Sequence, residues 1–126
     1  MRATDAVRTV VGVPLAVRPG LAARLLGVPP SGGLLLVARA LGIRYAVQGV
    51  ASGALTRTSW RHRVLVADAA VDGIHAASML PVAALLPHVA RPALVSAALA
   101  TTLAVLDGRA ARRRPTLRVL RGGAAA

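Results

Sequence analysis

The chain has 126 residues, of which 56% are hydrophobic and only 2% aromatic. This length is typical of one domain, and the apolar content exceeds the ~45–50% of an average soluble domain. The absence of cysteine excludes disulfides, zinc–thiolate sites and thiol catalysis.

The charge is carried almost entirely by arginine. Sixteen basic residues, all arginine, stand against four acids, all aspartate, which gives a net charge of +12. Such a surplus is often a sign of nucleic-acid binding. Here, however, most arginines lie between and after the long apolar segments, a distribution that is better explained by membrane topology.

The first apolar segment covers roughly residues 3–17 and is the weakest of four, because Arg8 and Pro14 lie inside it. Pro19 is expected to end it, since proline lacks an amide proton and disfavours helix in the residue before it. A cleaved signal peptide is an alternative interpretation. Asp5 in the basic start and the lack of a small-x-small cleavage site argue against it.

Residues 21–30 then predict a short amphipathic helix that Gly27 and two prolines close. The second apolar segment runs from about Ser31 to Thr56, with Ser31 as the expected N-cap. Its roughly 26 residues are enough to span a ~30 Å hydrocarbon core with some tilt.

A polar turn follows at residues 57–63, where Trp60 suits a headgroup interface. The third segment is expected from about Arg61 to Leu86, and the fourth from about Pro92 to Leu106. The remaining tail holds six arginines, and we expect it to be disordered unless it meets anionic lipid headgroups.

These elements predict an all-α fold, a four-helix transmembrane bundle. Residues 1–107 would form the membrane domain and residues 108–126 an Arg-rich cytoplasmic tail. With both termini inside, eleven arginines fall on the cytoplasmic side and three outside, as the positive-inside rule requires. The expected location is therefore a bacterial inner membrane. In one alternative the first segment lies in the interface, and in another the chain is a soluble basic bundle that binds nucleic acid.

The third segment carries a polar stripe. At ~100° per residue, Asp68, Asp72, His75 and Met79 share one helix face. Asp72 lies eleven residues, or roughly 16 Å, from Arg61 and therefore near the bilayer midplane.

The second segment offers partners for this stripe. Arg44 lies at nearly the same depth as Asp72, and Gln48 lies one turn further in, beside Asp68. An unpaired charge at the bilayer centre costs at least ~2.5–3.5 kcal/mol. We therefore expect Arg44 to meet Asp72, and Gln48 to meet Asp68.

This cluster of Arg44, Gln48, Asp68, Asp72 and His75 allows several functions. It is either a structural ion pair that fixes helix register or a site for a small ligand or partner subunit. A proton or transport pathway through Asp68, Asp72 and His75 is the main alternative. Metal binding by these three residues is a weaker hypothesis, because all three lie on one helix, and we expect neither metal nor cofactor.

The second segment also carries a face of small residues at Gly42, Ala46, Gly49 and Gly53, including a GxxxG motif. Small residues let helix backbones approach closely in membranes. We therefore expect helix packing here, within the bundle or in a homo-oligomer. No catalytic motif is present: the sequence contains no phosphate-binding glycine loop and no HExxH. The prediction is a protein without enzymatic activity.

Three stretches, "RPGLAARLLGVP", "RALGIRYAVQG" and "VADAAVDGIHA", give the chain a family likeness over residues 3–107. The pattern resembles small bacterial four-helix membrane proteins of unknown function that are distantly similar to the DoxX-like family. The matching positions are Gly42, Arg44, Asp68 and Asp72, whereas Tyr45 stands where that group commonly has an acid. The resemblance implies a four-helix membrane fold and at most an accessory role.

Overall fold

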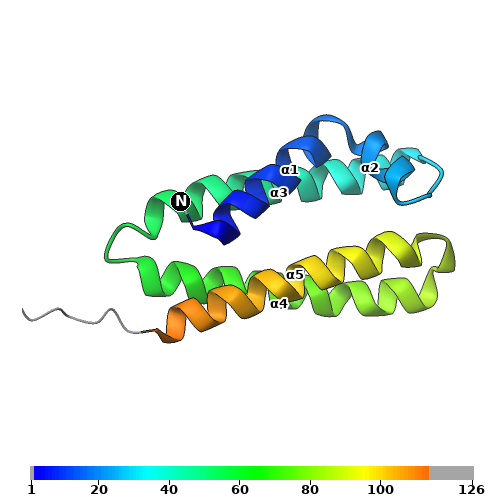
Figure 1. Cartoon of the computed structure of the whole chain (residues 1–126). Coiled ribbons are helices and arrows are strands. Elements are labelled where there is room, and N and C mark those ends of the chain that lie inside the picture. Colours follow the sequence, from blue (N-terminus) through cyan, green and yellow to red (C-terminus); the bar gives the residue numbers. More distant parts are fainter. Residues whose placement is uncertain (1, 114–126) are drawn as a thin grey trace, which may run out of the picture.

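A computed structural model describes residues 2–113, which are helical almost throughout and contain no strand. Figure 1 shows the long helices arranged side by side in a bundle. The elements are α1 (Ala3–Val17), α2 (Pro19–Leu25), α3 (Gly32–Leu55), α4 (Arg61–Leu85), the 3₁₀ turn η1 (Pro87–Val89) and α5 (Ala90–Arg112). The predicted all-α bundle is confirmed.

The bundle consists of two helix pairs. Helix α1 packs chiefly on α3 and α4 chiefly on α5, and the two pairs lie one above the other in Figure 1. The N-terminus, the α3–α4 connection and the end of α5 all lie at one end of the bundle. We call this the Arg-rich end, since the described arginines near it are Arg2, Arg57, Arg61, Arg63, Arg109, Arg112 and Arg113.

Local sequence signals set the helix boundaries on the first half of the chain. Helix α1 ends at Val17, just before Arg18 and Pro19, and α2 departs from it at an angle of 104°. Gly27, with a φ of +69°, reverses the chain after α2, as glycine does at a helix C-terminus. Ser31 caps α3, because its hydroxyl accepts a hydrogen bond from the Leu34 amide at 3.3 Å.

Helix α5, which corresponds to the fourth predicted apolar segment, differs from its predicted bounds. It begins at Ala90 and continues to Arg112, whereas the sequence analysis placed it from Pro92 to Leu106. Alanines favour helix over residues 110–111, and Arg109 and Arg112 complement the helix dipole in the last turn. The predicted boundary between residues 107 and 108 therefore falls inside α5. Most of the predicted tail, residues 114–126, lies outside the described residues.

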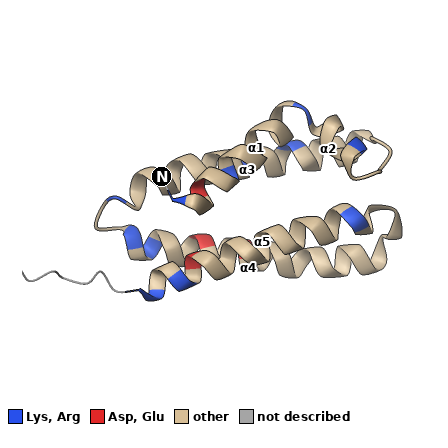
Figure 2. Cartoon of the chain, viewed as in Figure 1, with Lys and Arg blue, Asp and Glu red and all other residues tan. Residues whose placement is uncertain are grey.

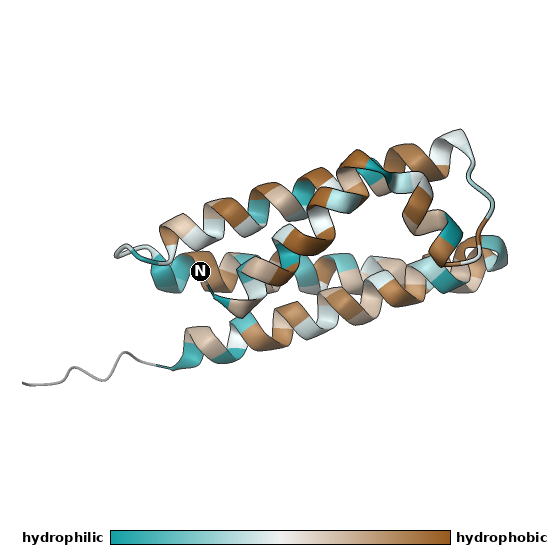
Figure 3. Cartoon of the chain, turned by 45° about the horizontal axis from the view of Figure 1, so that its top comes forward, coloured by the Kyte–Doolittle hydropathy of each residue, from teal (hydrophilic) through white to brown (hydrophobic). Residues whose placement is uncertain are grey.

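Hydrophobic side chains point outward along the whole bundle. Ile74 and Leu85 are 71% and 77% exposed, and every long helix has further exposed valines or leucines. Figure 3 shows hydrophobic residues along the length of the helices. The buried hydrophobic residues are mainly alanines, with Tyr45, Leu65 and Leu103. Three helices are long and apolar enough to cross a membrane, or four if α1 and α2 together count as one bent span.

Candidate functional site

All four aspartates of the chain lie buried in one cluster. They come from three helices, Asp5 from α1, Asp68 and Asp72 from α4, and Asp107 from α5. Figure 2 shows these acidic positions in the half of the bundle nearer the N-terminus. Three arginines, Arg2, Arg8 and Arg44, pair with them. We call these seven residues the Arg–Asp cluster.

Arg8 is the centre of the cluster. Its side chain is 0% exposed, and its guanidinium pairs with Asp72, with Asp107 at 2.8 Å and with Asp68 at 3.8 Å. One buried cation on α1 thus holds carboxylates from both α4 and α5. A guanidinium suits this position because its planar array of donors can serve several carboxylate oxygens at once.

The predicted contacts between α3 and α4 are present. Arg44 Nη2 donates to Asp72 Oδ1 at 2.7 Å, and Gln48 Nε2 donates to Asp68 Oδ1 at 2.9 Å. The Ser52 hydroxyl, one turn beyond Gln48, donates to the same Asp68 oxygen at 3.0 Å. The matching depths inferred from the sequence therefore bring these side chains together.

Hydrogen bonds connect the start of α1 to the C-terminal part of α5. Arg2 Nη1 donates to Asp107 Oδ1 at 2.9 Å, and the Thr4 hydroxyl donates to the same oxygen at 3.0 Å. Arg2 also pairs with Asp5, whose carboxylate accepts the backbone N–H of Arg2 at 3.1 Å. Asp5 therefore satisfies an amide at the start of α1 that the helix itself leaves free.

The cluster is the main polar connection between the two helix pairs. Breaking a buried ion pair typically costs about 3–5 kcal/mol, because the remaining charge is left without compensation. Here each aspartate carboxylate has at least one arginine within 4 Å. Because the cluster contains four aspartates and three arginines, it carries one formal negative charge in excess.

His75 lies apart from these ion pairs. Its Nε2 is 2.8 Å from the Ser96 hydroxyl on α5, and its ring packs edge-on against Tyr45 with centroids 6.4 Å apart. The helical stripe predicted from the sequence places His75 on the same side of α4 as the aspartates. The structure nonetheless directs it to α5. Within residues 2–113, no group of histidines and acids is arranged to hold a metal ion, so Asp68, Asp72 and His75 do not form the metal site considered above.

The small-residue face of α3 packs against α1 within the same chain. A Cβ on Gly42 would lie 2.3–2.8 Å from backbone atoms of α1, and one on Gly12 would lie 2.4–2.9 Å from backbone atoms of α3. A Cβ on Gly49 would lie 2.5–3.1 Å from atoms of Asp5 and Thr9, and one on Gly53 would lie 3.6–3.8 Å from the Asp5 side chain. Close backbone approach here positions α1 so that Asp5 and Arg8 reach the cluster.

Four of the seven cluster residues were not predicted from the sequence. Asp5, Arg8 and Asp107 are buried in the cluster, and Arg2 pairs with Asp5 and Asp107. One signal was available: Asp5 and Arg8 lie three residues apart and on the same α1 face as Gly12. An apolar segment that carries charges on its small-residue face is typical of a helix that turns this face inward.

Comparisons with protein-family models, curated proteins and solved structures found no match. The DoxX-like resemblance therefore stays a prediction.

Proposed function

We propose that this chain is a small integral membrane protein that acts as a non-enzymatic accessory or scaffold component. Its Arg–Asp cluster holds the two helix pairs in a fixed arrangement inside the bilayer. The helices then present an apolar outer surface to lipid or to a partner membrane subunit. That partner is either a different protein or a second copy of this chain.

One observation carries this proposal: each of the four aspartates lies within 4 Å of an arginine of the protein itself. Asp72 pairs with Arg8 and Arg44, Asp68 accepts from Gln48 and Ser52, and Asp107 pairs with Arg2 and Arg8. Asp5 pairs with Arg2. Asp68 Oδ2 and Asp107 Oδ2 accept no hydrogen bond and are held only by nearby arginines. Side chains that bind a substrate or carry protons need to exchange partners, whereas the pairing of every aspartate with arginines of the bundle favours a structural role.

The placement of apolar and charged residues supports a membrane location. All four aspartates and Arg8 are buried, while exposed apolar side chains cover the helices, the reverse of a soluble domain. The described arginines concentrate at the Arg-rich end, and the positive-inside rule then assigns this end, with both termini, to the cytoplasm of a bacterial inner membrane. Anionic headgroups of the inner leaflet are the partners we propose for these arginines and for the tail.

A charge-balance experiment tests the structural role. Asp72→Asn should lower the melting temperature of the detergent-purified protein, because Arg44 and part of Arg8 lose their partner. Adding Arg44→Gln removes the orphaned cation, so the double variant should recover part of the loss. Arg39→Gln is the matched control, an exposed arginine of the same helix. If Asp72→Asn melts like the wild type, the cluster is not a structural element.

The excess of one aspartate over the cluster arginines favours a second candidate, a proton-conducting or small transport protein that uses Asp68, Asp72 and His75. Proton flux into vesicles reconstituted with the purified protein separates the two. The scaffold proposal predicts that the proton flux equals that of vesicles without the protein. The transport proposal predicts a higher flux that Asp68→Asn or Asp72→Asn removes while the variant stays folded.

A further inference from the structure

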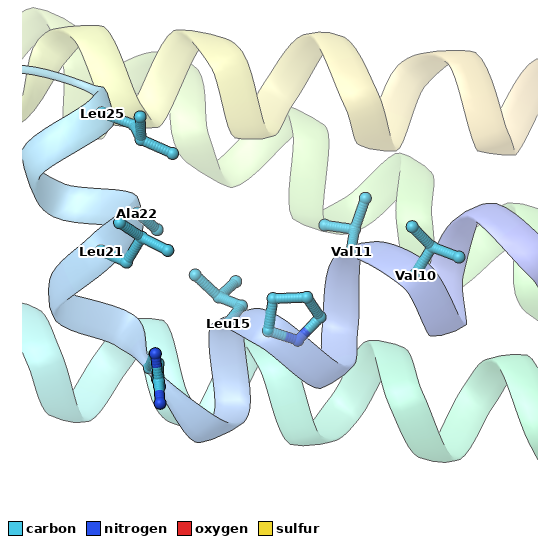
Figure 4. A pocket seen from close by; sticks show the side chains of 8 residues that line it. Val10, Val11, Leu15, Leu21, Ala22 and Leu25 are labelled. Atoms are coloured by element: carbon cyan, nitrogen blue, oxygen red, sulfur yellow. The ribbon is translucent and has the colours of Figure 1, made fainter.

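The bend between α1 and α2 leaves an apolar cavity on the outside of the bundle. Because α2 leaves α1 at 104°, the two helices form an angle rather than a continuous rod. Figure 4 shows Val10, Val11 and Leu15 of α1 facing Leu21, Ala22 and Leu25 of α2 across this angle. The cavity between them has a volume of about 170 Å³.

Its size and lining define what it can hold. Cavities of ~150 Å³ lined by aliphatic and aromatic side chains bind molecules the size of benzene. This one is therefore large enough for part of a hydrocarbon chain but too small for a whole lipid. Val10, Leu21 and Leu25 are also exposed on the outer surface, so the cavity opens toward the region that the membrane proposal fills with acyl chains.

One charged residue lines the cavity. Arg18, at the junction of α1 and α2, is exposed and contributes to the wall. All four aspartates are paired with Arg2, Arg8 and Arg44, so Arg18 has no acidic partner among the described residues. A free guanidinium at the edge of an apolar cavity is complementary to an anionic group joined to a hydrocarbon chain.

We propose that this cavity is a phospholipid-binding site. One acyl chain occupies the angle between α1 and α2, and the guanidinium of Arg18 binds the lipid phosphate. The bound lipid fills the space that the broken helix leaves and so completes the outer surface of the bundle. This inference rests on the proposed membrane location of the chain.

Native mass spectrometry of the detergent-purified protein tests the site, with dioleoylphosphatidylglycerol as the probe. The wild type should retain one lipid molecule more strongly than the rest. Arg18→Gln should lower that affinity about fivefold, the loss expected for one arginine–phosphate interaction of ~1 kcal/mol. Ala22→Phe should also lower it by filling the cavity without changing the charge. Arg24→Gln is the matched control: it removes an exposed arginine of α2 that does not line the cavity and should bind like the wild type.

Dioleoylglycerol, which has the same chains without the phosphate, shows whether Arg18 recognises the headgroup. It should bind the wild type about fivefold more weakly and should not distinguish Arg18→Gln from the wild type. If Arg18→Gln and Arg24→Gln bind phosphatidylglycerol with the same affinity, the proposed site is wrong. A wild type that needs detergent yet retains no lipid would overturn the site alone, whereas a wild type soluble without detergent would overturn the membrane proposal.

Discussion

At the scale of single residues, the arginines of the cluster are not equivalent. Arg8 is 0% exposed and pairs with carboxylates of two helices, whereas the Arg44 side chain is 28% exposed and pairs with Asp72 alone. The cost of losing a charge partner increases with burial, since water cannot take the place of the missing group.

We therefore expect Arg8→Gln to destabilise the protein more than Arg44→Gln does. The expected losses are about 3–5 kcal/mol for Arg8→Gln and roughly 1 kcal/mol for Arg44→Gln. Arg8→Lys should not restore full stability, because the guanidinium reaches Asp72 and Asp107 through Nη2 and Asp68 through Nη1, whereas lysine offers a single nitrogen. Thermal unfolding in detergent measures all three variants. Equal losses for Arg8→Gln and Arg44→Gln would argue against a central role for Arg8.

The sequence was sufficient to predict the contacts between α3 and α4, in which Arg44 and Gln48 each meet an aspartate at the same depth. Arg44 and Asp72 lie at nearly equal distances from the α3–α4 turn, so two adjacent antiparallel helices bring them together. Arg2, Arg8 and Asp107 depend on how α1 packs against α4 and α5. No periodicity within a single segment carries that information. His75 shows the same limit, since its contact with Ser96 depends on the rotation of α5.

At the scale of helices, the α1–α3 contact depends on glycines. The backbones at Gly12 and Gly42 approach so closely that no Cβ fits at either position. This contact fixes the depth and rotation of α1, and with them the positions of Asp5 and Arg8. The helix pair and the cluster are therefore one structural unit.

Gly42→Ala should accordingly destabilise the protein by about 1–3 kcal/mol, because the added methyl group forces the two backbones apart. Gly73→Ala is the matched control, since nothing lies within 4 Å of a Cβ at that position in α4. It should be neutral or stabilising by up to about 1 kcal/mol, the usual gain of alanine over glycine in a helix. Comparable destabilisation by both substitutions would contradict the close α1–α3 packing.

The limits of the long helices were largely predictable from the sequence, because prolines, Ser31 and the arginine-rich turns mark them clearly. The pairing of the helices was not. Four apolar segments of similar length can pack in several orders, and outward-facing valines and leucines do not distinguish between them. The positions of the charges on α1 are the feature that selects the observed arrangement.

At the scale of the whole molecule, we propose that the chain crosses a membrane with its Arg-rich end inside and its four aspartates buried in the bundle. Ser59, in the α3–α4 turn, and Pro30, between α2 and α3, are exposed and lie at opposite ends of α3. If α3 spans the bilayer, the two positions face different compartments. The natural sequence has no cysteine, so a single cysteine can be placed at either one without background.

Labelling of Pro30→Cys and Ser59→Cys with a membrane-impermeant maleimide, in intact cells and after lysis, tests this claim most directly. We predict that Pro30→Cys reacts in intact cells and that Ser59→Cys reacts only after lysis. If both cysteines are protected in intact cells and both react after lysis, or if Ser59→Cys alone reacts from outside, the proposed membrane arrangement is wrong.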